Sequence, residues 1–281
     1  MKSFSDILSE EVESTGSRLC VGLDIDREQL AFSGSTGLRD LASFGRMVVD
    51  ATLDYAVAYK LNLAFFERYG TDGFRWMEEV LAHIGGRRLT VADAKRGDIA
   101  SSARHYAASL FERFGFDAVT VNPYMGRDAI EPFLGDPGKG VFVICLTSNE
   151  GATDLQLQRV GSDPLYGKVI DLVKSLNGHR NCGLVVGSTW SKELPSIRRR
   201  AGDMPLLIPG IGPQGGDLVT GVREGNRGGI GLIAVSRAIL FVGDRSERAI
   251  RQAARRLWRD IRVILDEETL PPAGETPSGM D

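Results

Sequence analysis

The sequence predicts an α/β fold, a (β/α)8 TIM barrel in a single domain with an extra N-terminal helix. Three observations support this prediction: eight short apolar runs recur along the 281 residues, each run is nearly all apolar instead of alternating, and segments with helical spacing separate the runs. Uninterrupted apolar runs are typical of parallel strands that are covered on both faces. Eight strand-helix units in a chain of this length favour a barrel over the alternative, an open doubly wound sheet.

The predicted strands follow one another along most of the chain. They are residues 19–25, 56–62, 89–95, 117–122, 141–147, 183–188, 205–211 and 231–237. An amphipathic helix with Phe4, Ile7, Leu8 and Val12 on one face precedes the first strand. We expect this helix to cover the floor of the barrel.

The last predicted helix has the clearest amphipathic pattern. Its apolar face consists of Ala249, Ile250, Ala253, Leu257, Trp258, Ile261 and Ile264, and its polar face carries Arg251, Arg255 and Arg259. Ser246 is placed to cap its N-terminus. We assign residues 1–266 to one barrel domain and expect the polar, Pro- and Gly-rich residues 267–281 to form a disordered C-terminal tail.

The composition favours a cytoplasmic protein that acts on a small molecule. The formal net charge is -3, so no broad basic surface for nucleic acid is expected. No apolar run approaches the roughly 18 residues of a membrane span, and charged residues stand where a signal peptide needs an apolar stretch. Cys20, Cys145 and Cys182 are far apart in or beside apolar runs, which predicts reduced core thiols.

Polar residues that close the apolar runs are the candidate site residues, because a parallel barrel places its active site at the C-terminal ends of the strands. They are Asp24, Lys60, Asp93, Lys95, Asn122, Thr147, Ser148, Ser236 and Arg237, together with the glycine-rich residues 210–216. The run of arginines from Arg198 to Arg200 is interpreted as a solvated helix face.

The segment DAKRGD, residues 93–98, carries the densest charge pattern among these candidates. Asp93 and Lys95 are two residues apart on a predicted strand, so their side chains should point to the same side, into the barrel mouth. Asp98 lies past the strand end, where its carboxylate can contact the local site or reach a neighbouring subunit. By itself the pattern fits a solvated charged loop equally well. Lys60 and Asp24 at other strand ends favour a site, because clustered buried charges are costly unless used.

The glycine-rich loop matches the G-x-G-x-x-G spacing at Gly210, Gly212 and Gly215. A dinucleotide site is rejected, because the match follows the seventh predicted strand and no acidic residue ends the next one. Exposed backbone amides here, with Arg237 after the eighth strand, instead predict a phosphate-binding loop. A simple tight turn is the alternative.

The sequence favours a site without a metal or a cofactor. His83, His105 and His179 have no metal-ligand spacing, and no G-x-S-x-G motif indicates a serine nucleophile. Zinc hydrolysis and serine hydrolysis therefore lack support.

The segments VADAKRGDIASSA and AVAYKLNLAFFERYG resemble the orotidine 5'-phosphate decarboxylase family, specifically its second bacterial type. The likeness extends to GLDID, VTVNPYMGRDA, TSNEGA, IPGIGPQGGD and AVSRAI, and so to nearly every predicted strand end. The resemblance implies a cofactor-free carboxy-lyase that converts orotidine 5'-phosphate to uridine 5'-phosphate in de novo pyrimidine biosynthesis. It also implies a homodimer.

The resemblance further implies a role for each site residue. Lys60, Asp93, Lys95 and Asp98 would form an alternating charge array, with Asp98 contributed to the partner subunit's site. Lys95 would stabilise and protonate the C6 carbanion. The substrate-binding residues would be Asp24 for the ribose, Ser148 for the pyrimidine, Gln214 and Arg237 for the phosphate, and Ser102 in place of a threonine of the family.

Two other functions remain open at this stage. Metal-dependent sugar-phosphate decarboxylases and aldolases of the same superfamily share the D-x-K-x-x-D pattern, but they place an acidic metal ligand where this chain has Lys60. A barrel that senses a nucleotide phosphate without catalysis is the second alternative.

Overall fold

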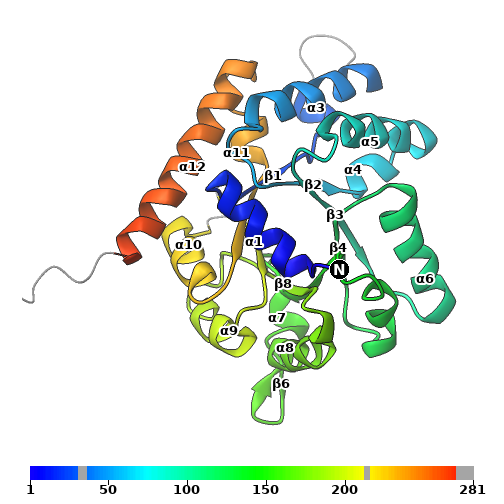
Figure 1. Cartoon of the computed structure of the whole chain (residues 1–281), viewed down its shortest axis with the longest axis vertical. Helices are drawn as coiled ribbons and strands as arrows, with labels where there is room; N and C mark the ends of the chain where they lie inside the picture. Colours follow the sequence, from blue (N-terminus) through cyan, green and yellow to red (C-terminus); the bar gives the residue numbers. More distant parts are fainter. Residues whose placement is uncertain (31–36, 212–215, 270–281) are drawn as a thin grey trace, which may run out of the picture.

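Eight parallel strands close into a barrel in the computed structural model, which describes residues 1–30, 37–211 and 216–269 (Figure 1). The strands are β1 (Leu19–Gly22), β2 (Ala58–Asn62), β3 (Leu89–Arg96), β4 (Ala118–Val121), β5 (Gly140–Leu146), β8 (Cys182–Val186), β9 (Leu206–Pro209) and β10 (Gly231–Val235). Neighbouring strands pair in this order, and β10 returns to pair with β1. Each predicted run overlaps one of them, and β3, β5 and β8 extend one residue beyond the predicted bounds, which confirms the TIM barrel.

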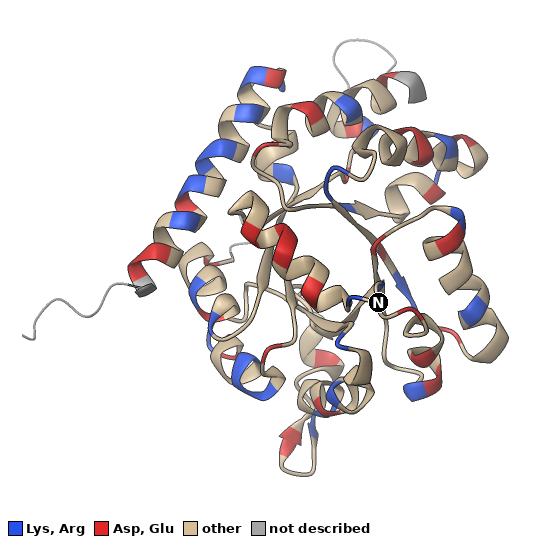
Figure 2. Cartoon of the chain, in the orientation of Figure 1, with Lys and Arg blue, Asp and Glu red and all other residues tan. Residues whose placement is uncertain are grey.

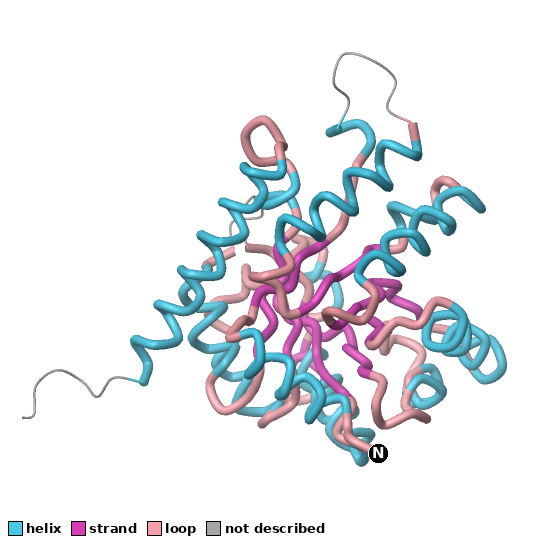
Figure 3. The backbone as a smooth tube through the Cα atoms, turned by 45° about the horizontal axis from the view of Figure 1, so that its top comes forward, coloured by secondary structure: helices cyan, strands magenta, loops and turns pink. Residues whose placement is uncertain are grey.

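Helices surround the strands on the outside of the barrel (Figure 3). The longer ones are α3 (Leu38–Thr52), α5 (Gly70–Ile84), α6 (Ala100–Ala108), α8 (Leu165–Leu176), α9 (Leu194–Ala201), α10 (Leu218–Asn226) and α12 (Glu247–Thr269). Short helices and turns complete the connections: α2 (Arg27–Leu30), α4 (Ala64–Glu67), η1 (Ser109–Arg113), η2 (Arg127–Ala129), η3 (Glu131–Phe133), α7 (Ala152–Leu155), η4 (Asn177–His179) and α11 (Arg237–Leu240). A small hairpin of β6 (Arg159–Val160) and β7 (Asp163–Pro164), which the sequence did not predict, stands apart from the barrel.

The N-terminal helix α1 (Phe4–Thr15) lies across one end of the barrel (Figure 1). Ser3 and Asp6 form a capping box at its start. Phe4, Leu8 and Val12 are buried in an apolar cluster with residues that point into the barrel, and the rings of Phe4 and Phe142 meet edge to face at 5.9 Å. This contact confirms that the helix covers the floor.

The last helix, α12, buries the face that the sequence predicts. Ile250, Ala253 and Ile261 are buried, and the Ser246 Oγ accepts a hydrogen bond from the backbone N–H of Ala249 at 3.2 Å. Figure 2 shows Lys and Arg recurring along its outer side, with both signs of charge on the other outer helices. The helix continues to Thr269, beyond the domain end predicted at residue 266. The remainder of the predicted tail, residues 270–281, lies outside the described residues.

The interpretation of residues 198–200 as a solvated face is wrong for Arg198. Its side chain is 2% exposed, and burial lowers its pKa to about 10. The guanidinium donates hydrogen bonds to the backbone carbonyls of Gly202, Met204, Gly225 and Ile230. It is buried because it supplies donors that these loop carbonyls lack.

The three cysteines are free and buried, as predicted. Burial raises the pKa of each thiol, Cys20, Cys145 and Cys182, to about 12. Within the described residues, no helix is long and apolar enough to cross a membrane. The same residues contain no cluster of three or more His, Cys, Asp or Glu side chains suited to a metal ion.

Candidate active site

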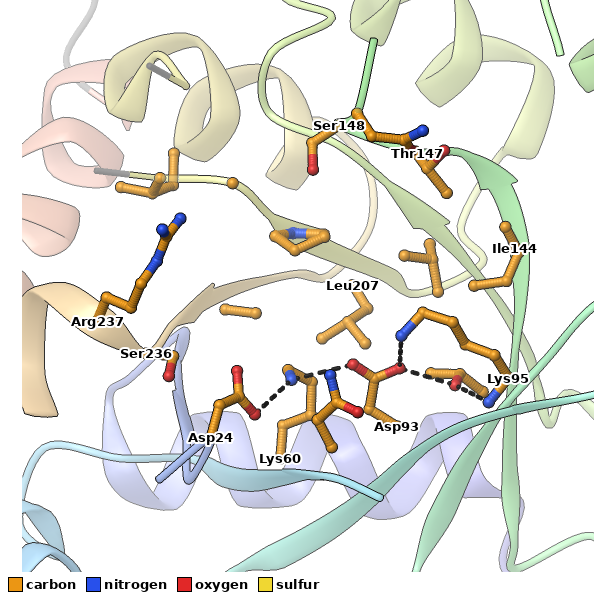
Figure 4. A pocket seen from close by; sticks show the side chains of 18 of the residues that line it. Asp24, Lys60, Asp93, Lys95, Ile144, Thr147, Ser148, Leu207, Ser236 and Arg237 are labelled. Carbon is orange, nitrogen blue, oxygen red and sulfur yellow. Dashed lines mark hydrogen bonds and ion pairs between the residues drawn. The ribbon is translucent and has the colours of Figure 1, made fainter. Parts of the chain in front are cut away.

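A pocket of about 500 Å³ opens at the C-terminal ends of the barrel strands, at the end opposite α1. Side chains from nearly every strand end line it, as Figure 4 shows. They include Asp24, Lys60, Asp93, Lys95, Thr120, Ile144, Thr147, Ser148, Val185, Leu207, Ser236 and Arg237. The predicted position of the site, at the mouth of the barrel, is therefore the position of this pocket.

Lys60 is the buried cation of the pocket. It lies within β2, its side chain is 7% exposed, and its Nζ is 3.4 Å from Asp24 Oδ1 and 3.1 Å from Asp93 Oδ2 (Figure 4). Burial by itself would lower the pKa of Lys60, but the two carboxylates outweigh burial and hold this pKa above its usual range. Lys60 is therefore charged at neutral pH.

Asp93 joins this buried lysine to a second, more exposed one. Its side chain is 12% exposed, and its Oδ1 accepts a hydrogen bond from Lys95 Nζ at 2.6 Å. Burial would raise the pKa of Asp93, but Lys60 and Lys95 outweigh that effect and hold this pKa below its usual range. Asp24, Lys60, Asp93 and Lys95 thus form a row of alternating charges.

Lys95 reaches Asp93 by a route other than the predicted one. The prediction relied on the regular alternation of a strand, but β3 is irregular here: Ala92 pairs with Val119, whereas Arg96 pairs with Val121. The β3 backbone bulges between these pairs, and Lys95 has a φ of 47°, in the left-handed region that a lysine seldom adopts. The two side chains meet as predicted, although the backbone between them is not that of a regular strand.

Asp98 and Ser102 do not lie with the other predicted site residues. Asp98 is half-buried, and its Oδ1 accepts the backbone N–H of Ile99 at 2.8 Å. Ser102 is exposed on α6. Neither residue is among the described residues that line the pocket. The chain by itself therefore brings five charged residues of the predicted set to the pocket, and Asp98 is not one of them; the five are Asp24, Lys60, Asp93, Lys95 and Arg237.

Ser148 projects into the pocket from the segment that follows β5. The preceding residue, Thr147, is fixed on both sides of its backbone: its N–H donates to the Gln156 side chain at 2.7 Å, and its carbonyl accepts from Trp190 Nε1 at 2.6 Å. A side chain at Gly187 would place a carbon 2.7 Å from the Ser148 nitrogen. Close packing therefore determines where the Ser148 hydroxyl points.

Arg237 lies on the far side of the pocket from Lys95 (Figure 4). It is exposed at the start of α11 and forms no ion pair with any of the described residues. The neighbouring Ser236 has a buried hydroxyl without a hydrogen-bond partner in the part of the chain that the structure describes. A cation and a hydroxyl in this position fit an anionic group, whereas Gln214 and the centre of the glycine-rich loop lie outside the described residues.

The sequence analysis missed Thr120 and the apolar lining of the pocket, such as Ile144 and Leu207. In the sequence all three stand within apolar strands and are typical of core residues. Thr120 is a polar residue inside the run AVTV, which is the one signal that could have indicated it. Asn122, a further candidate, lines a neighbouring pocket instead.

Comparison with known proteins gives a consistent result. Residues 17–252 match the Orotidine 5'-phosphate decarboxylase / HUMPS family. The orotidine 5'-phosphate decarboxylase of Natronomonas pharaonis is 44% identical over 264 residues, which cover 91% of this chain and 97% of that relative. That of Cupriavidus metallidurans is 43% identical over 268 residues, covering 94% and 98%. The structure of Leishmania donovani OMP decarboxylase matches with a TM-score of 0.82 at 38% identity, covering 93% of this chain and 98% of the other.

Proposed function

The chain belongs to the orotidine 5'-phosphate decarboxylase family, whose members are carboxy-lyases, and we propose that its Lys95 stabilises and then protonates C6 of the substrate. The overall reaction converts orotidine 5'-phosphate to uridine 5'-phosphate in pyrimidine biosynthesis. The observation that carries the proposal is the row Asp24, Lys60, Asp93 and Lys95 in one pocket at the barrel mouth.

The chemistry requires a fixed cation beside C6. Loss of CO2 leaves an electron pair on a ring carbon, where it lies in the ring plane and is poorly delocalised. A cation in a protein site stabilises such a charge by about 4 kcal/mol at a separation of 4 Å, for an effective dielectric constant near 20. The Lys95 side chain is 51% exposed, and its Nζ lies at the pocket, so its ammonium is accessible to a bound substrate.

The proposed step balances without a cofactor or a metal. The bond between C6 and the carboxylate carbon breaks, CO2 leaves, and the electron pair stays on C6. A proton of the Lys95 ammonium then moves to C6, and the neutral amine regains a proton from solvent. Asp93 holds the Lys95 ammonium at 2.6 Å and lies beside the departing carboxylate. We attribute the rate mainly to stabilisation of the transition state.

The other site residues hold the substrate in this proposal. Arg237, with Gln214 and the glycine-rich loop, binds the phosphate. Arg237 lies across the pocket from Lys95 (Figure 4), which supports a phosphate that is remote from C6. Asp24 accepts hydrogen bonds from the ribose hydroxyls while it faces Lys60. Ser148 recognises the pyrimidine. Phosphate binding contributes to catalysis by fixing the ring against Lys95.

We also propose a homodimer in which Asp98 completes the partner's site. Asp98 directly precedes Ile99, whose side chain is exposed, helix α6 exposes Tyr106, and the loop after β4 exposes Tyr124 and Met125. Exposed aromatic and aliphatic side chains of this kind are typical of protein interfaces. A partner on this surface would receive Asp98 near its own charge row, and it would also bring Ser102 close to the shared site.

The first test follows the ultraviolet absorbance of orotidine 5'-phosphate with the purified protein, with and without EDTA, and repeats it for Lys95→Ala. We expect turnover by the wild type that EDTA does not reduce, and a loss of turnover in Lys95→Ala. The control is Lys139→Ala, which removes a lysine that pairs with Asp117 at 3.7 Å on the floor side. This control should keep full activity.

Each other outcome rejects part of the proposal. Binding of uridine 5'-phosphate without turnover would indicate the sensor, and activity lost in EDTA would indicate the metal-dependent relative. Full activity of Lys95→Ala would refute the proton-donor role alone.

The second test mixes Lys95→Ala with Asp98→Ala. A heterodimer of these two variants contains one site with both residues intact, so random exchange should restore roughly a quarter of wild-type activity. Exchange is followed by native mass spectrometry of differently tagged chains. Demonstrated exchange without any gain in activity would contradict the shared site.

A further inference from the structure

The residue opposite the bulge in β3 is Thr120. Between the pairs Ala92 with Val119 and Arg96 with Val121, the β3 residues 93–95 face this single residue of β4. Thr120 is 1% exposed, yet it lines the pocket. Its position therefore places one hydroxyl against the part of β3 that carries both Asp93 and Lys95.

The Thr120 hydroxyl contacts both of these residues. Its Oγ1 accepts the backbone N–H of Lys95 at 2.9 Å and donates to Asp93 Oδ1 at 3.1 Å. The same Asp93 oxygen accepts the Lys95 ammonium at 2.6 Å. One hydroxyl thus binds the backbone from which Lys95 projects and the carboxylate that holds the end of its side chain.

These contacts stabilise the irregular backbone at Lys95. The left-handed φ of Lys95 is costly for a residue with a side chain, and it persists only when surrounding contacts fix it. In a bulge the regular backbone partners are missing, so the Lys95 N–H needs another acceptor. A threonine side chain has restricted rotation about χ1, which makes its hydroxyl a rigid acceptor.

We propose that Thr120 is a positioning residue for the decarboxylation: it holds the β3 bulge so that the Lys95 ammonium stays against Asp93 and faces the substrate. This inference rests on the proposed role of Lys95. Thr120 acts through the geometry of Lys95 and Asp93, so its loss should lower kcat and leave KM nearly unchanged.

The strand pair contains a matched control at its other end. Thr90 is also buried, and its Oγ1 accepts the backbone N–H of Asp117 at 3.3 Å and donates to Asp117 Oδ2 at 2.8 Å. Thr90→Val and Thr120→Val therefore remove the same hydroxyl and the same two kinds of hydrogen bond. Only Thr120 lies at the pocket.

The experiment compares kcat, KM and the melting temperature of Thr120→Val, Thr120→Ser and Thr90→Val. We expect Thr120→Val to lower kcat by about 10- to 100-fold, with KM within roughly threefold of the wild type. Thr120→Ser should recover most of kcat, because it keeps the hydroxyl. Thr90→Val should lower the melting temperature similarly but keep kcat. If Thr120→Val does not fold, Thr120→Ala takes its place.

Two kinetic results would overturn the inference: kcat of the Thr120 variant within twofold of the wild type, or an equal loss of kcat in Thr90→Val. A crystal structure of the Thr120 variant gives a readout that does not depend on turnover. It should show that Lys95 has left the left-handed region or lost its contact with Asp93, and unchanged Lys95 geometry would also overturn the inference. Absence of turnover in the wild type, in contrast, would refute the proposed function.

Discussion

The two ends of the β3 and β4 pair each hold a threonine, an aspartate and a lysine, but in different surroundings. At the floor, Thr90 and Lys139 both contact Asp117, and Lys139 Nζ also donates to the Phe116 carbonyl at 2.8 Å. The floor group joins chain segments, because its members bind backbone atoms as well as one another. It is a local support for the strand ends.

The group at the mouth lines the pocket. Asp93 is more buried than Asp117, with 12% of its side chain exposed against 35%, and it faces two lysines instead of one. The Lys95 ammonium donates to the Asp93 side chain, and the Lys95 side chain is half exposed and lines the pocket. In the proposed mechanism, burial, a second cation and an open cavity are what make the same three residue types reactive at the mouth.

The largest expected effect comes from removing the buried cation at the mouth. Lys60→Met leaves Asp24 and Asp93 facing each other without the charge between them. We expect kcat to fall at least about a hundredfold and the free energy of unfolding to fall by about 3–5 kcal/mol. Urea unfolding and the turnover assay measure these losses. The same substitution at Lys139 should cost about 1 kcal/mol or less and keep kcat.

The loss of stability in Lys60→Met should also depend on pH. In the wild type, the pKa of Asp93 is held below its unfolded value of 3.8, so Asp93 contributes stability above that pH and loses the contribution as the pH falls through the lower folded pKa. The stability advantage of the wild type over Lys60→Met should therefore shrink below about pH 4. An advantage that stayed constant down to pH 3 would contradict the electrostatic explanation.

A smaller overall effect is expected from a substitution at the floor, which should lower the free energy of unfolding but leave kcat nearly unchanged. Phe4→Ala removes the ring that packs against Phe142. We expect the free energy of unfolding to fall by about 3–5 kcal/mol, because a buried ring leaves a cavity. At temperatures where the variant is folded, kcat should stay within about twofold of the wild type. A large drop in kcat at full folding would mean that the two ends are coupled.

The smallest effect concerns the three thiols, which belong to neither charged group. Burial raises the pKa of Cys20, Cys145 and Cys182 to about 12, so each is a neutral thiol at pH 8. We expect DTNB to react with none of them in the native protein and with all three after unfolding in urea. Fast reaction of one thiol in the native protein would indicate local opening of the barrel around it.

Most of the fold and of the site could be predicted because both follow from strand patterns. Continuous apolar runs identified the barrel strands, and the polar residues that end them, such as Lys60, Ser148 and Arg237, do lie around the pocket. The charge of Lys60 is visible in the sequence, and its burial follows from its position in a strand.

The features that escaped prediction depend on contacts between distant segments. Nothing in the residues around Lys95 signals a left-handed backbone, because the acceptor that supports it comes from Thr120 on the next strand. Likewise, the burial of Arg198 depends on loop carbonyls near Gly225 and Ile230. Local patterns indicate which residues are polar, but not which unsatisfied backbone groups they will meet.

The helix across the floor gives the barrel a closed bottom. Because Phe4, Leu8 and Val12 fill that end, the proposed reaction must take in substrate and release both CO2 and nucleotide product through the mouth. In the proposed cycle, small, neutral CO2 passes the nucleotide that is still bound, whereas solvent reaches the Lys95 amine freely only after the nucleotide has left. Lys95 is therefore reprotonated between turnovers, and its reprotonation is coupled to release of the nucleotide product.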